Sequence, residues 1–540
     1  MDPRFASAAA VLAIAVCSWS AGPSPAGPSP SSLAAGHRID TFTTSEQCGV
    51  CHTTAPGATA MLDANGDDVS PYGTWQATMM ANSFRDPYFR AQLMKETAAA
   101  GEQVQELCLR CHVPMVHHEA RLKGDKAPRL ADAEGDLFAD DGVSCTVCHL
   151  MDGKNFGELG SFSGQPSFGR DRRIFGPFQN PATRPMQNFV RYTPTHGPHV
   201  QQAGLCGTCH TLFTEHHGTP FPEQTPYLEW RNSEFSDERE GADPATTRTC
   251  QQCHMARSAP TRIARNPQGF DFNIPAREGY ALHTFVGGNA FMLELLNEHR
   301  EDLDVLAEPA QFARTIAATR KQLAEATARV AIGKVARAGQ VAAFEVQVEN
   351  LTGHKFPTGY PARRAWLAVE IEVGGEVVFA CGQMDERGRL VGVADEQRLV
   401  HRDLVEKPGD VVVYEMVAHD PEGAPTTYLT KMVKRAKDNR LLPRGWRHDG
   451  PHIGDTAPVG VDGDADFTGG GDKVAFRVQL PAAATGPCTV RATLCYQTVP
   501  PAWVDALRPV EAEEAKRFVG YYDAAKKAPE VVARAERKQD

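Results

Sequence analysis

The sequence lacks features that would place it in two common classes of protein. No apolar run approaches the roughly 20 residues that a helix needs to span a bilayer. Positive charge is not in excess, because 56 Lys and Arg stand against 67 Asp and Glu and give a formal net charge of -11. This balance argues against nucleic acid as a partner. With 540 residues, of which 41% are hydrophobic and 23% charged, the chain is expected to be globular, with two or three domains.

The N-terminus has the pattern of an export signal. Arg4 precedes a short apolar stretch at 5–16, and the small residues Ser18 and Ser20 follow it. A signal peptide over 1–20 is therefore predicted, followed by a disordered Pro/Ser-rich linker over 21–37. This places the mature protein in the periplasm or at the cell surface. Two alternatives stay open: an uncleaved helix that tethers the chain to a membrane, and a lipid anchor on Cys17, although Val16 fits the lipobox poorly.

Ten of the 14 cysteines lie in five copies of one short pattern, C-x-x-C-H. The copies are Cys48, Cys51 and His52; Cys108, Cys111 and His112; Cys145, Cys148 and His149; Cys206, Cys209 and His210; and Cys250, Cys253 and His254. The pattern is the attachment motif of c-type haem. Two thiols on one side of a helical turn can form thioethers with the two vinyl groups of one porphyrin. The next residue then presents its imidazole to the iron.

Zinc sites and disulfides are the alternatives to haem at these cysteines. Zinc needs four ligands from paired motifs and does not require a His after every second Cys. Disulfides suit an exported protein, but five strained three-residue bridges in one chain would be unusual. Five covalently attached haems are therefore predicted. Outside the motifs, either Cys488 or Cys495 pairs with Cys381, or all three are buried free thiols.

The pattern of the chain changes twice after the last motif. Residues 38–305 are rich in Gly, Pro, His and Cys and show only short helical segments, for example at 72–81, 85–99 and 227–234, which is typical of a domain whose core is made of haems. A connecting helix is predicted over 306–330. Alternating stretches such as VAAFEVQVENL and KVAFRVQL predict an antiparallel β-sandwich over 331–500. A helical tail is predicted over 501–540. The predicted fold class is α+β multidomain.

Several stretches of this chain are shared with a known family. They are YGTWQATMMAN at 72–82 with RDP at 85–87, EQTPYLEW at 223–230, HTFVGG at 283–288, GHKFPTG at 353–359 and YQ at 496–497. Through them the chain resembles the multihaem cytochromes related to cytochrome c-554, in the form with a C-terminal immunoglobulin-like β domain. The resemblance implies a periplasmic or cell-surface electron carrier, and some relatives are oxidoreductases of nitrogen compounds.

The iron atoms also need ligands on their second, distal side. The family motif W-x-x-S-x-H supplies one such His, but this chain has Met80 at that position, with Met79 beside it. A thioether can also bind haem iron and raises its reduction potential; core packing is the alternative. The histidine candidates are His117, His118, His199, His283 and His354, with His196, His216 and His217 as weaker ones. The β-domain residues His401, His419, His448 and His452 are expected to be ordinary side chains.

Two acidic loops resemble parts of calcium sites. Asp63, Asn65, Asp67 and Asp68 form one, and Asp462, Asp464 and Asp466 form the other. Both have oxygen ligands at alternate positions, and neither has the downstream Glu of a full EF-hand loop. Calcium is one interpretation, and ordinary polar turns are the other.

Three functions fit this sequence. The leading prediction is one-electron transfer to and from redox partner proteins. The second is an oxidoreductase in which one haem lacks a distal ligand and acts on a small nitrogen or sulfur compound, although no C-x-x-C-K variant is present. The third is a structural role for the β domain in docking or in assembly of an oligomer.

Overall fold

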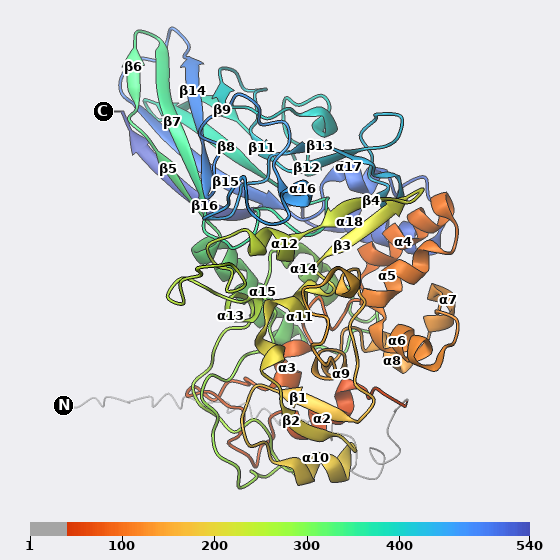
Figure 1. The fold of residues 1–540 in the computed structure, drawn as a ribbon. Helices are drawn as coiled ribbons and strands as arrows, with labels where there is room; N and C mark the ends of the chain where they lie inside the picture. Colours follow the sequence, from red (N-terminus) through yellow and green to blue (C-terminus); the bar gives the residue numbers. More distant parts are fainter. Residues whose placement is uncertain (1–39, 540) are drawn as a thin grey trace, which may run out of the picture. The chain divides into compact units, whose positions relative to one another are not determined.

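The computed structural model describes residues 40–539, which all lie in one unit of the chain. The predicted signal peptide, the Cys17 anchor and the linker fall outside the described residues. A first part with many short helices is followed by a part rich in β-strands (Figure 1). The predicted α+β fold class is therefore confirmed.

Short helices joined by turns make up the first part. They are α2 (Ser45–His52), α3 (Pro71–Trp75), α4 (Pro87–Ala100), α5 (Val104–His112), α6 (Pro114–Lys123), α7 (Leu130–Ala133), α8 (Leu137–Asp140), α9 (Cys145–His149), α10 (Thr183–Phe189), α11 (Ala203–Gly207), α12 (Pro226–Arg231), α13 (Cys250–His254) and α14 (Ala290–Glu298). Two small sheets accompany them: β1 (Arg173–Gly176) pairs in parallel with β2 (Thr193–His196), and β3 (Leu212–His216) forms a hairpin with β4 (Thr219–Gln224).

Three helices were predicted here, and their starts follow from local sequence. Helix α4 begins after Asp86, whose carboxylate accepts hydrogen bonds from the N–H groups of Tyr88 and Phe89, with Pro87 in the first turn. Both features favour a helix start. Helices α3 and α12 also begin at a proline, but both are shorter than expected.

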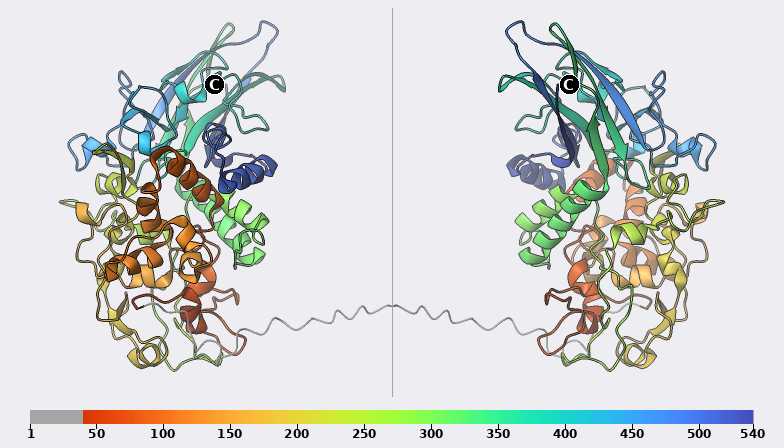
Figure 2. Two further views of the ribbon diagram at one scale, coloured as in Figure 1. Left: turned by 90° about the vertical axis from the view of Figure 1, so that its right-hand side faces the viewer. Right: turned by 90° about the vertical axis from the view of Figure 1, so that its left-hand side faces the viewer.

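The connecting helix is α15 (Pro309–Ala326), which lies against α14 (Figure 2). A capping box between Glu308 and Gln311 starts it, as this pairing does in other helices. Its apolar face buries Phe312 and Ile316 together with residues of α14. The prediction placed its end at residue 330, four residues too late, because strand β5 begins at Ala328.

Two five-stranded sheets make up most of the second part. The first has the order β10–β14–β7–β5, with β6 also paired to β7, and the second has the order β11–β8–β15–β16, with β9 paired to β8. Their strands are β5 (Ala328–Ile332), β6 (Ala336–Ala338), β7 (Val341–Asn350), β8 (Arg364–Val373), β9 (Glu376–Cys381), β10 (Leu404–Val405), β11 (Val413–Tyr414), β14 (Gly471–Gln479), β15 (Cys488–Gln497) and β16 (Glu530–Lys538). A separate pair, β12 (Met416–His419) and β13 (Lys434–Asp438), is antiparallel.

The two large sheets share one apolar core. Inward residues of β7 and β14, such as Phe344 and Phe476, join Val369 and Ile371 of β8 and Val490 of β15 in a single buried cluster. The alternation of buried and exposed residues along these strands is the period expected of a sheet with one buried face. All pairings in the two sheets are antiparallel except the short β10–β14 contact.

The helical prediction for residues 501–540 is wrong in its last part. Helices α17 (Pro501–Asp505) and α18 (Glu513–Ala524) do form, and α18 packs on α4. Residues Glu530–Lys538, however, form strand β16, which pairs antiparallel with β15. Their Ala, Glu, Arg and Lys content favours a helix, but backbone pairing with the open side of β15 overrides this local preference.

The three described cysteines outside the motifs lie in strands β9 and β15 of the second five-stranded sheet. Cys381, Cys488 and Cys495 are buried, and all three are free thiols. Of the two sequence alternatives, the structure therefore has buried free thiols rather than a disulfide.

A buried ionic network ties the first part to the second. Glu229 of α12 accepts hydrogen bonds from the Lys355 N–H and the Thr358 hydroxyl, and it pairs with Arg440 at 3.1 Å. Arg440 and the Lys355 ammonium both bind Asp438, each at 2.7 Å. The side chains of Glu229, Lys355 and Asp438 are fully buried. Burial alone would raise the pKa of Asp438, but the charges of Arg440 and Lys355 overcome this and hold it below its usual range.

None of the helices within residues 40–539 combines the length and the hydropathy that a bilayer span requires.

Asp438→Asn is expected to lower the free energy of unfolding by about 3–5 kcal/mol, because it leaves the buried Lys355 ammonium without its carboxylate partner. Guanidinium denaturation followed by circular dichroism measures this. Glu536→Gln is the control: it removes one exposed pair with Arg491 and should cost at most about 1 kcal/mol. Equal effects of the two substitutions would contradict the role given to the network.

Candidate functional site

The five C-x-x-C-H motifs lie at the ends of short helices. In α2, α5, α9 and α13 the motif histidine is the last helical residue, and α11 ends inside the fourth motif at Gly207. The helical turn brings both cysteines of a motif to one side, as the thioether chemistry requires. None of the described cysteines forms a disulfide, so the ten motif thiols are available for covalent attachment.

Backbone carbonyl groups orient four of the five motif imidazoles. The Nδ1 atoms of His52, His112 and His149 lie 2.7, 3.1 and 2.6 Å from the carbonyl oxygens of Ile263, Ser83 and Phe175. His254 makes the same contact with Val286. A carbonyl oxygen only accepts, so Nδ1 carries the proton and Nε2 keeps its lone pair. This is the tautomer that binds a metal through Nε2, with the second nitrogen held by a carbonyl.

Burial keeps these imidazoles in the neutral form that binds iron. It lowers the pKa of all five motif histidines, which are His52, His112, His149, His210 and His254. For His112 and His210 the pKa falls to about 4. The Phe89 ring also lies flat on His112, with ring centroids 3.6 Å apart. The residues present therefore fit a covalently held haem at each motif.

Two of the predicted distal histidines face motif histidines. The rings of His149 and His283 have centroids 6.3 Å apart at an interplanar angle of 26°. Those of His254 and His354 are 6.1 Å apart at 16°. Two imidazoles bound in trans to one metal, each through a bond of about 2 Å, have centroids roughly 6 Å apart. Both spacings match this arrangement.

The two facing histidines carry the same orienting contact as the motif histidines. The Nδ1 of His283 lies 3.1 Å from the Ala281 carbonyl, and that of His354 lies 2.9 Å from the Lys355 carbonyl. Nε2 is therefore the free nitrogen in each. Burial lowers the pKa of both.

The other distal candidates differ from this pattern. His199 uses Nε2 for the Met151 carbonyl, at 3.0 Å, which leaves Nδ1. His117 is buried beside Glu106, and the Nδ1 of the neighbouring buried His118 has no hydrogen-bond partner among the described residues. His216 has its Nδ1 on the Thr430 carbonyl at 2.8 Å. His216 was a weaker candidate in the sequence, although its Nδ1 makes the same kind of carbonyl contact as that of His283.

The two methionines have different surroundings. Met79 packs against two apolar clusters, one of which includes Leu293, so it behaves as a core residue. Met80 is half-buried and belongs to neither cluster, and its carbonyl accepts the N–H of Val143, two residues before Cys145. Met80 stays the predicted distal ligand of the pair.

Contacts between thiols show which motifs are neighbours. Hydrogen bonding with the Cys48 thiol raises the pKa of Cys145, and the same kind of contact links Cys206 to Cys250 and Cys209 to Cys111. Burial, with the charges of Cys206 and Cys209, raises the pKa of Cys148 to about 12. The first motif therefore adjoins the third, the third adjoins the fourth, and the fourth adjoins the second and the fifth.

A repeated Tyr-x-x-Trp element supports two of these neighbouring pairs. A Cβ atom at Gly49 would lie 3.0 Å from the Tyr72 ring, and one at Gly207 would lie 2.7 Å from the Tyr227 ring. The close approach of each tyrosine requires glycine after the first cysteine of its motif.

The tryptophan of each element forms a hydrogen bond with the segment just before the neighbouring motif. The indole N–H of Trp75 donates to the Val143 carbonyl at 3.0 Å, and that of Trp230 donates to the Arg248 carbonyl at 2.9 Å. Both carbonyls lie two residues before a motif, at Cys145 and Cys250. Both stretches were recognised in the sequence as family stretches, but their equivalence was missed. The signal was present, because PYGTW and PYLEW share the same Pro-Tyr-x-x-Trp pattern.

The motif side chains do not gather into zinc sites. Among residues 40–539, the clusters of three or more His, Cys, Asp or Glu ligand atoms lie at Asp403, Asp464 and Asp466, and at His401, Asp464 and Asp472. No motif residue belongs to either. The loop at Asp63–Asp68 forms no such cluster, whereas the loop at Asp462–Asp466 contributes to both.

Residues 47–150, which hold the first three motifs, match the family model of cytochrome c554 and c-prime. The fold is similar to the crystal structure of a penta-haem cytochrome c552 from Thermochromatium tepidum. That match has a TM-score of 0.54 and 17% sequence identity, and it covers 93% of this chain and 100% of the other. No curated protein matches the sequence.

The predicted resemblance to multihaem cytochromes related to cytochrome c-554, with a sheet-rich C-terminal half, is confirmed. The comparisons support a haem-based electron-transfer protein.

His283→Ala and His354→Ala are each expected to convert about one haem per chain from low-spin to high-spin, because each would remove one of the two predicted axial imidazoles. Electron paramagnetic resonance of the ferric protein measures the change. His448→Ala, at an exposed position of the β domain, is the control and should leave the spectrum unchanged. A spectrum of His354→Ala identical to the control would remove His354 from the ligand set.

Proposed function

We propose that this chain is an exported pentahaem c-type cytochrome that passes single electrons along five covalently bound haems. The observation that carries the proposal is the pairing of His149 with His283 and of His254 with His354, at 6.3 and 6.1 Å between ring centroids. An iron with two axial imidazoles has no open position for a substrate, and such irons exchange electrons.

The chain's own residues would hold each haem at three points. The two thiols of a motif would form the thioethers, and the motif histidine would bind the iron through Nε2. Haem, when bound, supplies a one-electron iron couple. The Nδ1 contacts to Ile263, Ser83, Phe175 and Val286 fix the imidazole planes and increase the basicity of Nε2.

The order of the motifs in space supports transfer from one haem to the next. The thiol contacts link all five motifs into one connected set, in which the fourth has three neighbours. The motif imidazoles are also close to one another. Burial is the main cause that lowers the pKa of His112 and of His210, and a nearby histidine charge adds to it in each case. That histidine is His210 for His112, and His254 for His210. Each haem would therefore have another within close range.

Export to the periplasm or cell surface is part of the proposal. It is supported by the signal-like pattern over 1–20 and by the use of ten cysteines for covalent haem. The partners would be proteins that donate and accept electrons, and the net charge of -11 favours partners with basic surfaces. A retained N-terminal anchor and assembly through the β domain remain alternatives to a free monomer.

An oxidoreductase is the second candidate, and one group of residues favours it. Glu223 and Tyr88 are buried and Tyr360 is half-buried, and the hydroxyl groups of the two tyrosines contact each other. They lie near the second motif. Burial is the main cause that raises the pKa of Cys108 in that motif, and the charge of Glu223 is the next largest. Burial also raises the pKa of Glu223 to about 8. Such groups could serve a small nitrogen or sulfur substrate at an open haem.

About five haems per chain are expected in protein made in a host with c-type haem maturation, because each motif attaches one. Intact-mass measurement and a pyridine haemochrome assay count them. Cys250→Ser with Cys253→Ser should reduce the count by one without changing the others. A wild-type count of four or fewer would contradict the pentahaem proposal.

The fully ferric protein is expected to give only low-spin signals if every iron has two axial ligands. Spin-quantified electron paramagnetic resonance, scaled to the haem count, measures this. A high-spin component of about one haem per chain would overturn the purely electron-carrying role. It would direct attention to the Glu223 side chain, with Glu223→Gln as the variant to assay with nitrite, hydroxylamine and sulfur oxyanions.

A further inference from the structure

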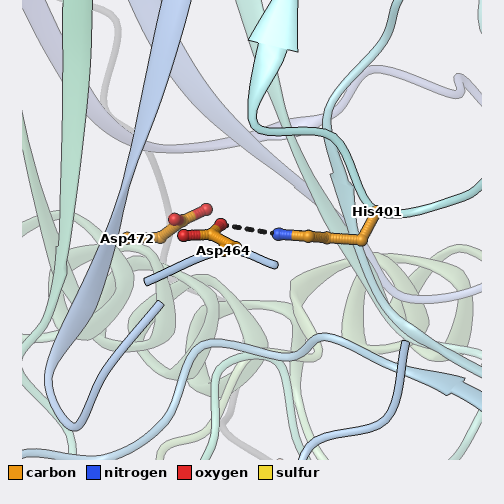
Figure 3. Close-up of side chains that lie close together, drawn as sticks. All are labelled: His401, Asp464 and Asp472. Atoms are coloured by element: carbon orange, nitrogen blue, oxygen red, sulfur yellow. Dashed lines mark hydrogen bonds and ion pairs between the residues drawn. The ribbon is translucent and has the colours of Figure 1, made fainter. Parts of the chain in front are cut away.

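Four aspartates gather at one place in the β domain, away from the C-x-x-C-H motifs. Ligand oxygens of Asp403, Asp464 and Asp466 lie within 4.8 Å of one another, and those of Asp464 and Asp472 lie within the same distance of each other and of His401. Figure 3 shows the Asp472 and Asp464 carboxylates close together, with His401 directed at Asp464. The residues come from three segments: the chain before β10, the loop before β14, and β14 itself.

Asp472 has an oxygen that the protein leaves without a partner. Its side chain is buried, with 2% exposed, and Oδ2 accepts the Tyr414 hydroxyl at 2.7 Å. Oδ1 has no hydrogen-bond partner among the described residues. Burial, together with the charges of Asp464 and Asp466, raises the pKa of this carboxyl to about 8. An unsatisfied buried oxygen costs free energy, and a cation beside Asp464 would satisfy it.

The loop fixes Asp464 at the centre of the group. Its Oδ1 accepts the N–H groups of Asp466 and Phe467, both at 3.0 Å. Gly463, with φ of 91°, makes the turn just before it. The carboxylate is thus held in place by its own loop, and Asp466 beside it lines a surface hollow through which an ion could enter.

The hydrogen bonds of His401 decide which ions the group can take. Its Nδ1 lies 3.0 Å from Nδ2 of Asn439 and its Nε2 lies 2.8 Å from Oδ2 of Asp464. The orientation of the Asn439 side-chain amide is fixed, because its Oδ1 accepts the Glu415 N–H and its Nδ2 donates to the Val413 carbonyl.

His401 is therefore a hydrogen-bond donor and not a metal ligand. Since Asn439 donates to Nδ1, the proton of the neutral ring is on Nε2, which donates it to Asp464. The remaining ligands are all carboxylate oxygens. Such a set suits a hard cation and disfavours zinc and other ions that prefer nitrogen. Ligands from three separate segments suit the flexible coordination of Ca²⁺ better than the strict octahedron of Mg²⁺.

We propose that Asp403, Asp464, Asp466 and Asp472 bind one Ca²⁺, centred on Asp464. The ion would join the segment before β10 to the loop and first residues of β14, and so fix this end of the sandwich. The proposal is independent of the electron-transfer function.

The test uses the full haem-loaded chain after treatment with EGTA and desalting. Isothermal titration with CaCl₂, and metal analysis by mass spectrometry after dialysis, should show one Ca²⁺ per chain. Asp464→Asn should weaken binding tenfold or more while keeping the loop, since the amide oxygen can still accept the two N–H groups. Asp466→Asn provides a second variant in case the first does not fold, which circular dichroism and the haem absorption spectrum would show.

Asp63→Asn is the matched control. Asp63 also accepts two backbone N–H groups through Oδ1, those of Asn65 and Asp67, but its loop gathers no carboxylate cluster, so Ca²⁺ binding should be unchanged. No Ca²⁺ binding up to millimolar concentration, or equal binding by wild type and Asp464→Asn, would overturn the proposal. Equal affinity for Mg²⁺ or preference for Zn²⁺ would overturn the assignment to Ca²⁺.

Discussion

The hydrogen bond from the Nδ1 of a motif histidine to a backbone carbonyl is the constraint on which the first part of the molecule depends. The carbonyl partners are distant in sequence: Ile263 lies 211 residues after His52, and Val286 lies 32 after His254. Each contact does two things at once. It fixes the tautomer and the direction of an imidazole, and it holds a loop that has little regular structure of its own. A chain with few long helices thereby obtains a defined path.

The segment Gly353–Gly359 extends the same constraint into the β domain. His354 faces His254, Lys355 binds Asp438, and Thr358 donates to Glu229. Three contacts therefore fall within five residues: an imidazole that faces a motif histidine, a buried ion pair, and a link to helix α12. The ionic network is fully buried, so losing one member would leave the others without compensation. The β domain is therefore a structural part of the region that holds the C-x-x-C-H motifs and not an appendage to it.

The sequence was enough for the features that depend on local patterns. The spacing of cysteines and histidines located every motif, alternation located the main strands, and the family stretches pointed to His283 and His354. It was not enough where distant groups decide the outcome. Strand β16 has the composition of a helix and becomes a strand only because β15 offers it an edge. The role of His401 depends on the rigid orientation of Asn439. The neighbours of each motif depend on contacts between segments that lie far apart in the chain, which no local pattern encodes.

The crowded position of the fourth motif has a consequence for how charge would accumulate. Its cysteines contact those of the second and fifth motifs, and their charges help to raise the pKa of Cys148 in the third. With haems bound as proposed, an electron on this central iron would raise the energy of a second electron on any of three neighbours, since charges interact strongly in a buried, weakly polar interior. The reduction of neighbouring haems would then be anti-cooperative. The fourth haem would act as a branch point that is seldom occupied together with its neighbours, so that an electron arriving by one arm has two exits.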